Sequence, residues 1–335
     1  MSDKNVYFNA LKAKKLLTMT QRLCLLPIRP DEQDVWKIYL TQEDNSWGVN
    51  EVNLADDLKD YPLMSELEKQ VFDITIARFA VADKPVVDGL VCLTDLVKPD
   101  DMVRMMMLNS QARIEGVHMH MYSKFITNII TDPEKRNKLQ EAVSSYPSIK
   151  RAVDLVKAYQ HEGIDERVLL LSQACAEGIG FSTSFAIAMY YKTVGKMFGF
   201  AYGNSKVMQD EHIHYQHACE WLSHFDELDD DVFNDVVKAY VDVEVQFANE
   251  AFGDQSLGIL NAQSLAEYAR QIANLLCINC NKPPLYKELP NPLPYMDMTS
   301  LKSKTNFFER NVPDYKKLSA EDALLELEID ATQIV

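Results

Sequence analysis

Two short stretches of this chain have the same form, Glu115-Gly-Val-His118 and Glu211-His-Ile-His214. Both lie within long amphipathic patterns of helical period, and a Glu and a His three residues apart lie on the same face of a helix. Each stretch therefore predicts a carboxylate and an imidazole that point toward one metal ion. A single Glu-x-x-His match arises easily by chance. Other residues of the chain are therefore needed to distinguish a metal site from a chance match.

The composition is that of a helix-rich globular protein. The chain has 335 residues, of which 47% are hydrophobic, and only 11 glycines. No uncharged apolar run is long enough for a transmembrane helix, and the residues after Met1 lack the basic and apolar segments of a secretory signal. A formal net charge of −16 argues against nucleic-acid binding, which needs positive potential. We therefore expect a cytoplasmic protein that binds neither nucleic acid nor membranes.

Helical periodicity recurs along most of the chain, and no series of alternating strands does. The patterns predict an all-α protein with about eight main helices. Pro85 is expected to kink or end one helix just after Asp83, and Gly203-Asn-Ser205 is expected to form a turn before the helix that carries Glu211. Other helices are predicted at about 32–42, 101–131, 136–145, 148–160, 165–190, 230–252 and 261–279.

The six cysteines are spread along the chain, mostly in apolar helical patterns where a thiol acts as a small buried hydrophobe. Cys277-Ile-Asn-Cys280 is the one Cys-x-x-Cys pair. No second pair or nearby His completes a zinc site, and no βαβ pattern surrounds the pair as in thioredoxins. We interpret these residues as ordinary reduced thiols.

Ligand-type residues occur among apolar neighbours on four successive predicted helices. They are Asp83, Glu115, His118, Glu177, Glu211 and His214. Any one of these acids could lie on a solvated face, but a buried carboxylate needs a partner or a metal. Single-carboxylate helices alternate with Glu-x-x-His helices, which is the arrangement of the dinuclear site in a ferritin-like helical bundle. We therefore predict that fold, with a dinuclear iron or manganese site in its four-helix core.

Tyr122 follows Glu115 by seven residues, or two helical turns, so it lies on the same face near the predicted metals. One interpretation is a core tyrosine with a satisfied hydroxyl group. The other is a redox-active phenol in a dry pocket. Phe181, Phe185 and Val207 would surround it with apolar groups, but they would be core residues under either interpretation.

From about Leu26 to Tyr315, these motifs resemble the radical-generating small (β) subunit of class I ribonucleotide reductase. The family's ligand order of Asp, Glu-x-x-His, Glu and Glu-x-x-His matches the six residues above. Its radical tyrosine stands four residues after the first histidine, where this chain has Tyr122. Asn291-Pro-Leu-Pro-Tyr295 resembles the family's segment after the last long helix.

The resemblance implies roles for further residues. Trp47, Asp210 and Tyr315 match the family's radical-transfer residues, and Tyr315 lies in a C-terminal tail with Glu309 six residues before it. His118, Asp210 and Trp47 would form a hydrogen-bonded route outward. The three apolar residues around the radical tyrosine would form its pocket.

The resemblance also implies an activity and partners. The chain would assemble a dimetal–oxygen cofactor from two iron ions, or two manganese ions, and O₂. It would oxidise Tyr122 to a stable tyrosyl radical and pass the oxidising equivalent to a large catalytic subunit that reduces ribonucleotides to deoxyribonucleotides. A homodimer is expected. Residues 1–30 would be an irregular arm, 31–290 the ferritin-like domain, and 291–335 a C-terminal segment whose flexible tail docks to the large subunit.

Two features depart from the family pattern. Lys84-Pro85 follows the first predicted ligand, and one apparent extra residue precedes Glu115. These departures leave Asp88 as the fallback for Asp83 as a ligand. His120 lies on a different face from Glu115, so we leave it out of the site.

Two other classes of protein remain as alternatives. The first is a stand-alone dimetal-carboxylate oxidase or oxygenase on the same fold, against which Asp83, Tyr122 and Tyr315 all count. The second is an iron-storage or purely structural helical protein, which would need neither Tyr122 in an apolar pocket nor a dedicated tail.

Overall fold

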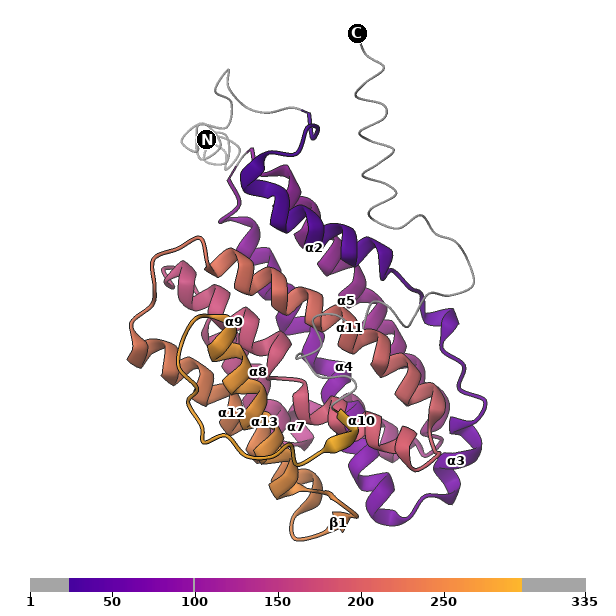
Figure 1. The fold of residues 1–335 in the computed structure, drawn as a ribbon. Coiled ribbons are helices and arrows are strands. Elements are labelled where there is room, and N and C mark those ends of the chain that lie inside the picture. The colour runs from indigo at the N-terminus through magenta and orange to yellow at the C-terminus, as the bar shows by residue number, and fades with distance from the viewer. Residues whose placement is uncertain (1–23, 99, 297–335) are drawn as a thin grey trace, which may run out of the picture.

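The computed structural model describes residues 24–98 and 100–296, and these residues fold into helices with one short hairpin (Figure 1). The α-helices are α2 (Gln33–Asp44), α3 (Asp57–Leu63), α4 (Glu66–Thr94), α5 (Met102–Ile129), α6 (Pro133–Gln140), α7 (Ala142–Ser145), α8 (Pro147–Ala158), α9 (Glu166–Gly178), α10 (Ser182–Thr193), α11 (Phe198–Leu222), α12 (Asp230–Phe252) and α13 (Ala262–Asn279). Single 3₁₀ turns are η1 (Pro30–Glu32), η2 (Val49–Glu51) and η3 (Pro294–Met296), and β1 (Ser256–Leu257) pairs antiparallel with β2 (Leu260–Asn261). The all-α prediction is confirmed.

Helices α4, α5, α9 and α11 form the centre of the molecule, with α4 against α5 and α9 against α11. Helix α2 crosses α5 and α11 on one side, and α12 packs against α8, α9 and α13 on the other (Figure 1). The faces that meet are lined with fully buried aromatic and aliphatic side chains. The burial of this apolar surface is the main stabilising term of the fold.

Helix α4 continues through Pro85, so the expectation that the helix could end after Asp83 is wrong. A proline inside a helix removes one backbone hydrogen bond. Buried apolar side chains on both sides, including Phe79 and Val86, hold the helix in place despite this loss. The side-chain amide of Gln160 also donates to the carbonyl oxygen of Pro85 at 2.7 Å. Asp83 therefore lies in a helix interior.

The single helix predicted from Asp165 to Tyr190 is in fact two helices, α9 and α10. The N–H of Gly180 donates to the carbonyl oxygen of Cys175 at 2.9 Å, which closes the end of α9. A Cβ atom at Gly180 would clash with the backbone oxygen of Ala176, so this tight bend requires glycine.

Gly203-Asn-Ser205 lies inside α11, so the turn predicted there is wrong. Helix α11 begins earlier because Asp57 of α3 accepts hydrogen bonds from the N–H groups of Gly199 and the next residue, at 2.8 and 2.7 Å. Gly203 serves helix packing instead, since a Cβ atom there would clash with the sulfur of Met121 on α5. The close approach of α5 and α11 brings their side chains into one core.

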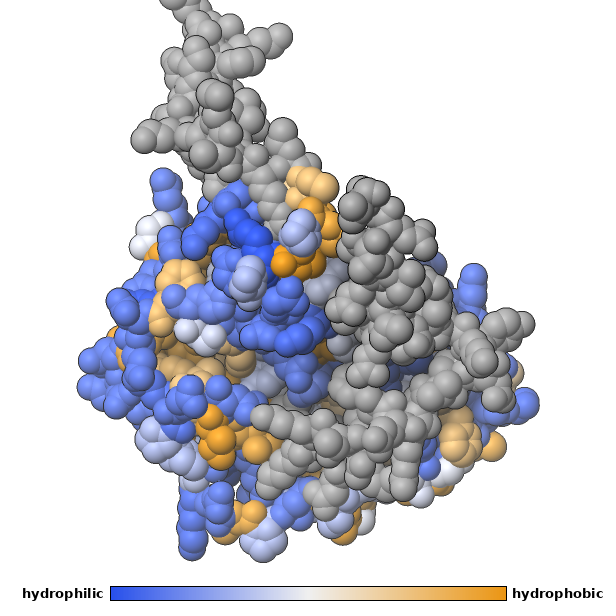
Figure 2. Space-filling model, turned by 45° about the horizontal axis from the view of Figure 1, so that its top comes forward, coloured by the Kyte–Doolittle hydropathy of each residue, from blue (hydrophilic) through white to orange (hydrophobic). Residues whose placement is uncertain are grey.

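The surface view in Figure 2 is mainly hydrophilic, and apolar side chains occur on it in separate small groups. Within residues 24–98 and 100–296, no helix combines the length and hydrophobicity that crossing a membrane requires. Residues 1–23 and 297–335 lie outside the described part. The predicted tail, including Tyr315, therefore has no structural description.

Candidate metal centre

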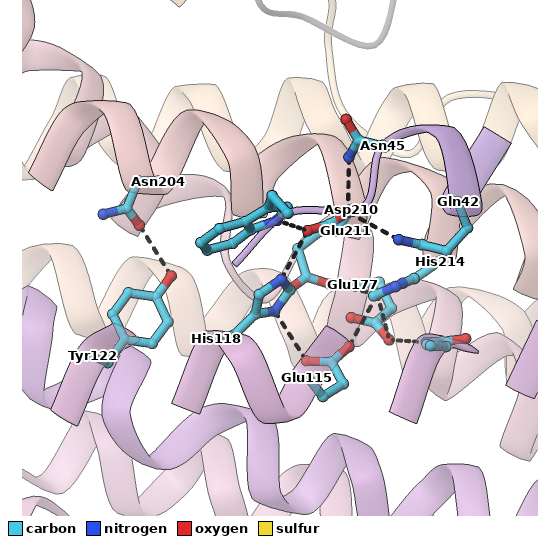
Figure 3. A network of polar contacts seen from close by, with 12 residues as sticks. Gln42, Asn45, Glu115, His118, Tyr122, Glu177, Asn204, Asp210, Glu211 and His214 are labelled. Carbon is cyan, nitrogen blue, oxygen red and sulfur yellow. Dashed lines mark hydrogen bonds and ion pairs between the residues drawn. The ribbon is translucent and has the colours of Figure 1, made fainter. Parts of the chain in front are cut away.

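Six buried side chains from the four central helices converge between those helices, and Figure 3 labels all of them except Asp83. They are Asp83 from α4, Glu115 and His118 from α5, Glu177 from α9, and Glu211 and His214 from α11. They form two overlapping groups of four, and the ligand atoms within each group lie within 4.8 Å of one another. The structure thus brings together all six residues that the sequence predicted as ligands.

Glu115 and Glu211 belong to both groups. His118 Nδ1 lies 3.2 Å from Glu115 Oε2 and 3.3 Å from Glu211 Oε1. On the other side, His214 Nδ1 lies 3.0 Å from Glu115 Oε1 and 3.0 Å from Glu211 Oε2. Each glutamate therefore has one oxygen near each imidazole, so both glutamates lie between the two histidines.

Several oxygen atoms of this cluster have no hydrogen-bond partner. Both carboxylate oxygens of Asp83 and Oε2 of Glu177 are buried without one. Within the described residues, the three glutamates form ion pairs with His118 and His214, and none of the four carboxylates pairs with a lysine or arginine. Burying such oxygens is costly unless they bind a cation, so the donor set fits a pair of hard or borderline metal ions.

The electrostatics of the cluster agree with this conclusion. Burial and the neighbouring Glu115 raise the pKa of Asp83 well above its ordinary value. Burial and the neighbouring Glu211 do the same to the pKa of Glu177. These carboxylates repel one another in a dry site, and added positive charge would relieve that repulsion.

The two histidines respond in the opposite direction. Although burial opposes it, hydrogen bonds to Asp210 and Glu115 raise the pKa of His118 well above its ordinary value. Hydrogen bonds to Glu115 and Glu211 raise the pKa of His214 to about 9, again against burial. The same two imidazoles lower the pKa of Glu211 despite its burial. Without metal, the cluster favours protons on its imidazoles as its source of positive charge.

Asp210 lies behind His118 and accepts four hydrogen bonds (Figure 3). Its Oδ2 atom accepts from Trp47 Nε1 at 2.7 Å and lies 3.0 Å from His118 Nε2. Its Oδ1 atom accepts from Gln42 and Asn45 at 3.0 and 2.8 Å. The carboxylate therefore fixes the His118 ring with Nδ1 toward the cluster, as carboxylates commonly do for ligating histidines.

Sequence reasoning missed the amides that hold the other end of the cluster. Gln111 and Gln173 each donate to Oε1 of Glu177 at 2.8 Å. Gln173 stands four residues before Glu177, so helical spacing was a usable signal. Gln111 comes from α5, and its contact depends on how the helices pack.

Tyr122 is completely buried, and its O–H donates to Oδ1 of Asn204 at 3.1 Å (Figure 3). The ring stacks on Phe79 with centroids 4.7 Å apart and an interplanar angle of 3°. Phe181 and Phe185 pack against Phe79, at 6.1 and 5.3 Å between centroids. Burial, followed by the charge of the nearby acids, raises the pKa of the phenol well above its ordinary value. Val207 is also buried in this core.

Two residues around Tyr122 were not foreseen. Phe79 stands one turn before Asp83 on the same helix face, so its position could have been inferred from spacing. Asn204 lies within the segment that was wrongly predicted as a turn. Its contact with Tyr122 was therefore not predicted.

The remaining acids and histidines near these motifs lie elsewhere. Asp88, the fallback ligand, pairs with Lys84 at the surface of α4. His120 is exposed. His212 interacts with Gln216, and burial lowers its pKa to about 4.

His217 is buried and stacks on Trp221, with ring centroids 5.8 Å apart. It belongs to neither group of ligand-type side chains. His217 therefore lies outside the ligand cluster, although it stands only three residues after His214.

Comparison with known proteins identifies the family. Residues 23–292 match the family model described as ribonucleotide reductase, small chain. The ribonucleoside-diphosphate reductase small chain of Plasmodium falciparum is 30% identical over 317 residues, which cover 92% of this chain and 87% of the relative. A family match of this extent confirms the resemblance, and it does not favour a stand-alone oxidase.

Solved structures share the fold. The ribonucleotide reductase Rnr4 homodimer of Saccharomyces cerevisiae has a TM-score of 0.70 at 16% identity, and the match covers 85% of this chain and 94% of that one. The dimanganese(II)-NrdF of Streptococcus sanguinis has a TM-score of 0.69 at 16% identity, with 81% and 96% covered. The predicted ferritin-like fold is thereby confirmed. The chain belongs to the ribonucleotide reductase small-chain family, whose members are subunits of an oxidoreductase.

Proposed function

We propose that this small chain holds two metal ions and carries a tyrosyl radical at Tyr122. The observation that supports this most is the pair of overlapping ligand groups that share Glu115 and Glu211. Asp83 and His118 would complete the ligands of one ion. Glu177 and His214 would complete the other in the same way.

The donor set suits iron or manganese. Four carboxylates carry a charge of −4 when ionised, which two divalent ions would balance. Imidazole and carboxylate donors are common to sites for both metals. When bound, the ions would supply the electrons that reduce O₂ and so permit the one-electron oxidation of a nearby side chain. We propose two iron ions, with two manganese ions as the second choice; the related Streptococcus protein is a dimanganese protein.

The surroundings of Tyr122 suit a long-lived radical. Its ring is enclosed by Phe79 and the apolar core, which keeps out water and reductants. The hydroxyl group of Tyr122 donates a hydrogen bond to Asn204. When the phenol is oxidised it loses its proton, and an amide oxygen is too weak a base to accept that proton. The proton would move to a carboxylate of the cluster. Among the acids, Asp83 has the largest effect on the pKa of the phenol, and its oxygens have no hydrogen-bond partner.

A route outward begins at His118. The hydrogen bonds from His118 to Asp210 and from Trp47 to the same oxygen link the cluster to the loop after α2. The rings of Trp47 and His118 also lie 6.0 Å apart. We propose that this route carries the oxidising equivalent toward a large catalytic subunit that reduces ribonucleotides. Tyr315, in a tail outside the described residues, would continue it.

We also propose a homodimer, in keeping with the homodimeric relative from Saccharomyces. Analytical ultracentrifugation at micromolar concentration tests this directly. A sedimentation coefficient of a dimer is expected. A stable monomer would contradict the proposal.

The replacement Tyr122→Phe tests the radical. The variant should fold and bind metal like the parent but give no tyrosyl signal by electron paramagnetic resonance after anaerobic loading with ferrous iron and exposure to O₂. The matched control is Tyr191→Phe, another fully buried tyrosine, whose hydroxyl bonds to a backbone oxygen of α4. This control should keep the radical. An undiminished signal in Tyr122→Phe would assign the radical to another residue.

Two changes separate the proposed roles of the tail. Deleting residues 316–335 should leave the metal site and the radical intact and abolish binding to the large subunit. Tyr315→Phe should keep binding and stop nucleotide reduction. Full turnover by the truncated chain at the same concentrations would contradict the docking role.

A further inference from the structure

Four cysteines lie close enough to influence one another's ionisation where α9, α11 and α13 meet. Cys219 on α11 and Cys280 at the end of α13 line the same pocket, and each is the largest influence on the pKa of the other. Cys175 and Cys277 are buried, whereas Cys219 and Cys280 are half-buried. The partner of Cys280 is thus a residue 61 positions earlier in the chain, rather than Cys277 of the Cys-x-x-Cys motif.

A pocket of about 280 Å³ opens onto this pair. Cys219 and Cys280 both line it, together with Asn279, Lys282 and residues of the loop between α11 and α12. Neither Cys175 nor Cys277 is part of its wall. The volume is several times that of a water molecule, so the pocket can admit one end of a small organic thiol or disulfide.

The two thiols differ in acidity. The hydrogen bond with Cys219 and the charge of Lys282 lower the pKa of Cys280, although burial opposes this. The same contact with Cys280, together with burial, raises the pKa of Cys219 well above its ordinary value. Lys282 is itself held in place, because its ammonium group donates to Asp230 at 2.7 Å and Glu227 at 3.0 Å. Cys280 is therefore the better nucleophile at neutral pH.

Cys280 also lies where the backbone can adjust. It is the C-cap of α13, and Asn281 after it has a positive φ of 57°. The N–H of Lys282 donates to the carbonyl oxygen of Cys277 at 2.8 Å, which closes the helix end. Helix ends open at lower cost than helix interiors, so the two sulfurs can approach to bonding distance without unfolding the core.

We propose that Cys219 and Cys280 form a redox-active dithiol that exchanges with the disulfide of a small thiol compound entering through this pocket. The Cys280 thiolate attacks one sulfur of that disulfide, forms a mixed disulfide and releases one thiol. Cys219 then loses its proton and attacks Cys280 Sγ, which releases the second thiol. The chain's two thiols are oxidised to one disulfide, the incoming disulfide is reduced to two thiols, and the two cysteine protons pass to the released thiolates.

The bond would join the C-terminal part of α11 to the end of α13. Helix α11 also carries His214, five residues before Cys219. The oxidation state of the pair would therefore set how firmly the end of a ligand-bearing helix is held. This inference stands independently of the proposed radical function.

The test uses the full-length, metal-loaded chain and oxidised glutathione. After incubation, the remaining thiols are alkylated and the protein is digested and analysed by mass spectrometry. We expect a peptide pair joined through Cys219 and Cys280, formed faster than any modification of the half-buried Cys92 on α4. Separately alkylated Cys219 and Cys280, or a bond between Cys277 and Cys280, would overturn the proposal.

Two variants assign the roles. Cys219→Ser should stop the reaction at the mixed disulfide, so that glutathione stays attached to Cys280. Cys280→Ser should react no faster than Cys92 does. Cys92→Ser is the matched control and should form the internal disulfide like the parent. If zinc protected both thiols in the purified chain and had to be removed before any reaction, the pair would be a metal site instead and the proposal would fail.

Discussion

Among the buried charged side chains of the described residues, two groups are neutralised differently. Arg78 and Glu244 form an ion pair between α4 and α12, and both carboxylate oxygens of Glu244 are satisfied, one by Arg78 and the other by Thr183. The guanidinium group also lies over the ring of Phe247, 4.4 Å from its centre. In this group the positive charge comes from the chain itself.

The metal-centre cluster has no arginine or lysine counter-ion among the described residues. The ion pairs of its carboxylates are made only with the two histidines, and both oxygens of Asp83 have no hydrogen-bond partner. Both groups are equally removed from water, so burial alone does not separate a structural ion pair from a metal site. What separates them is whether the surrounding side chains supply the opposite charge.

The largest difference should appear when a shared ligand is removed. Glu211→Ala deletes a carboxylate of both ligand groups, so we expect the chain to lose both metal ions while it remains folded. His214→Ala should lower the metal content as well. Plasma mass spectrometry after gel filtration measures the metal bound per chain, and circular dichroism checks the fold.

His212→Ala is the matched control, since His212 neighbours Glu211 on the same helix but interacts with Gln216. It should keep about the metal content of the parent. Equal loss of metal from His212→Ala would mean that the ligand face of α11 has been assigned wrongly.

The reverse result is expected for the ion pair. Arg78→Met leaves Glu244 buried without its counter-ion, and breaking such a pair costs about 3–5 kcal/mol of stability. Urea unfolding of the metal-free protein measures the free energy of unfolding. Metal stoichiometry of the folded fraction should not change, because neither residue belongs to the ligand groups.

An exposed ion pair is the control for the effect of Arg78→Met on the free energy of unfolding. Lys150 and Asp154 on α8 form an exposed ion pair, and Lys150→Met should change the free energy of unfolding by less than about 1 kcal/mol. If Arg78→Met lowered the free energy of unfolding no more than Lys150→Met does, Arg78 would not be the counter-ion that neutralises the buried Glu244.

An intermediate effect is expected behind the metal centre. Asp210→Asn keeps the shape of the side chain but removes the charge that orients His118, and such changes typically cost about 10–100-fold in metal affinity. Competition with a chelator of known affinity measures the loss. Glu220→Gln, a change at a carboxylate on the same helix that pairs with Arg104, should leave the affinity unchanged. An unchanged affinity in Asp210→Asn would remove this residue from the support of the metal site.

The last prediction concerns the hydrogen bond of the Tyr122 phenol. Asn204→Ala leaves the buried hydroxyl of Tyr122 without its acceptor, at a cost of about 1–3 kcal/mol. Adding Tyr122→Phe to that variant should recover most of the loss, because both polar partners are then gone. A double-mutant cycle of urea unfolding measures this coupling. No coupling between the two positions would mean that the hydrogen bond contributes nothing to stability.

The six ligand-type residues could be predicted because their chemistry and spacing are local properties of helices. A Glu and a His three residues apart share a face whatever the rest of the fold does. The chain around Pro85 could not be predicted in the same way, since packing of α4 against its neighbours outweighs the lost hydrogen bond. The same applies to Gly203, where glycine allows α11 to approach Met121 and does not form a turn.

The supporting side chains were the least predictable. Asn204, Gln111 and Asn45 come into contact with the site only through the packing of separate helices, and amides occur often enough that sequence alone gives no reason to single them out. The shared pocket of Cys219 and Cys280 has the same origin.

The most direct test of the proposed metal centre is a crystal structure of the full-length chain loaded with ferrous iron, with anomalous diffraction recorded at the iron edge. We expect two iron peaks per chain, one within reach of Asp83 and His118 and the other within reach of Glu177 and His214. Glu115 and Glu211 should contact both. A single peak, or iron bound away from these six residues, would contradict the dinuclear centre.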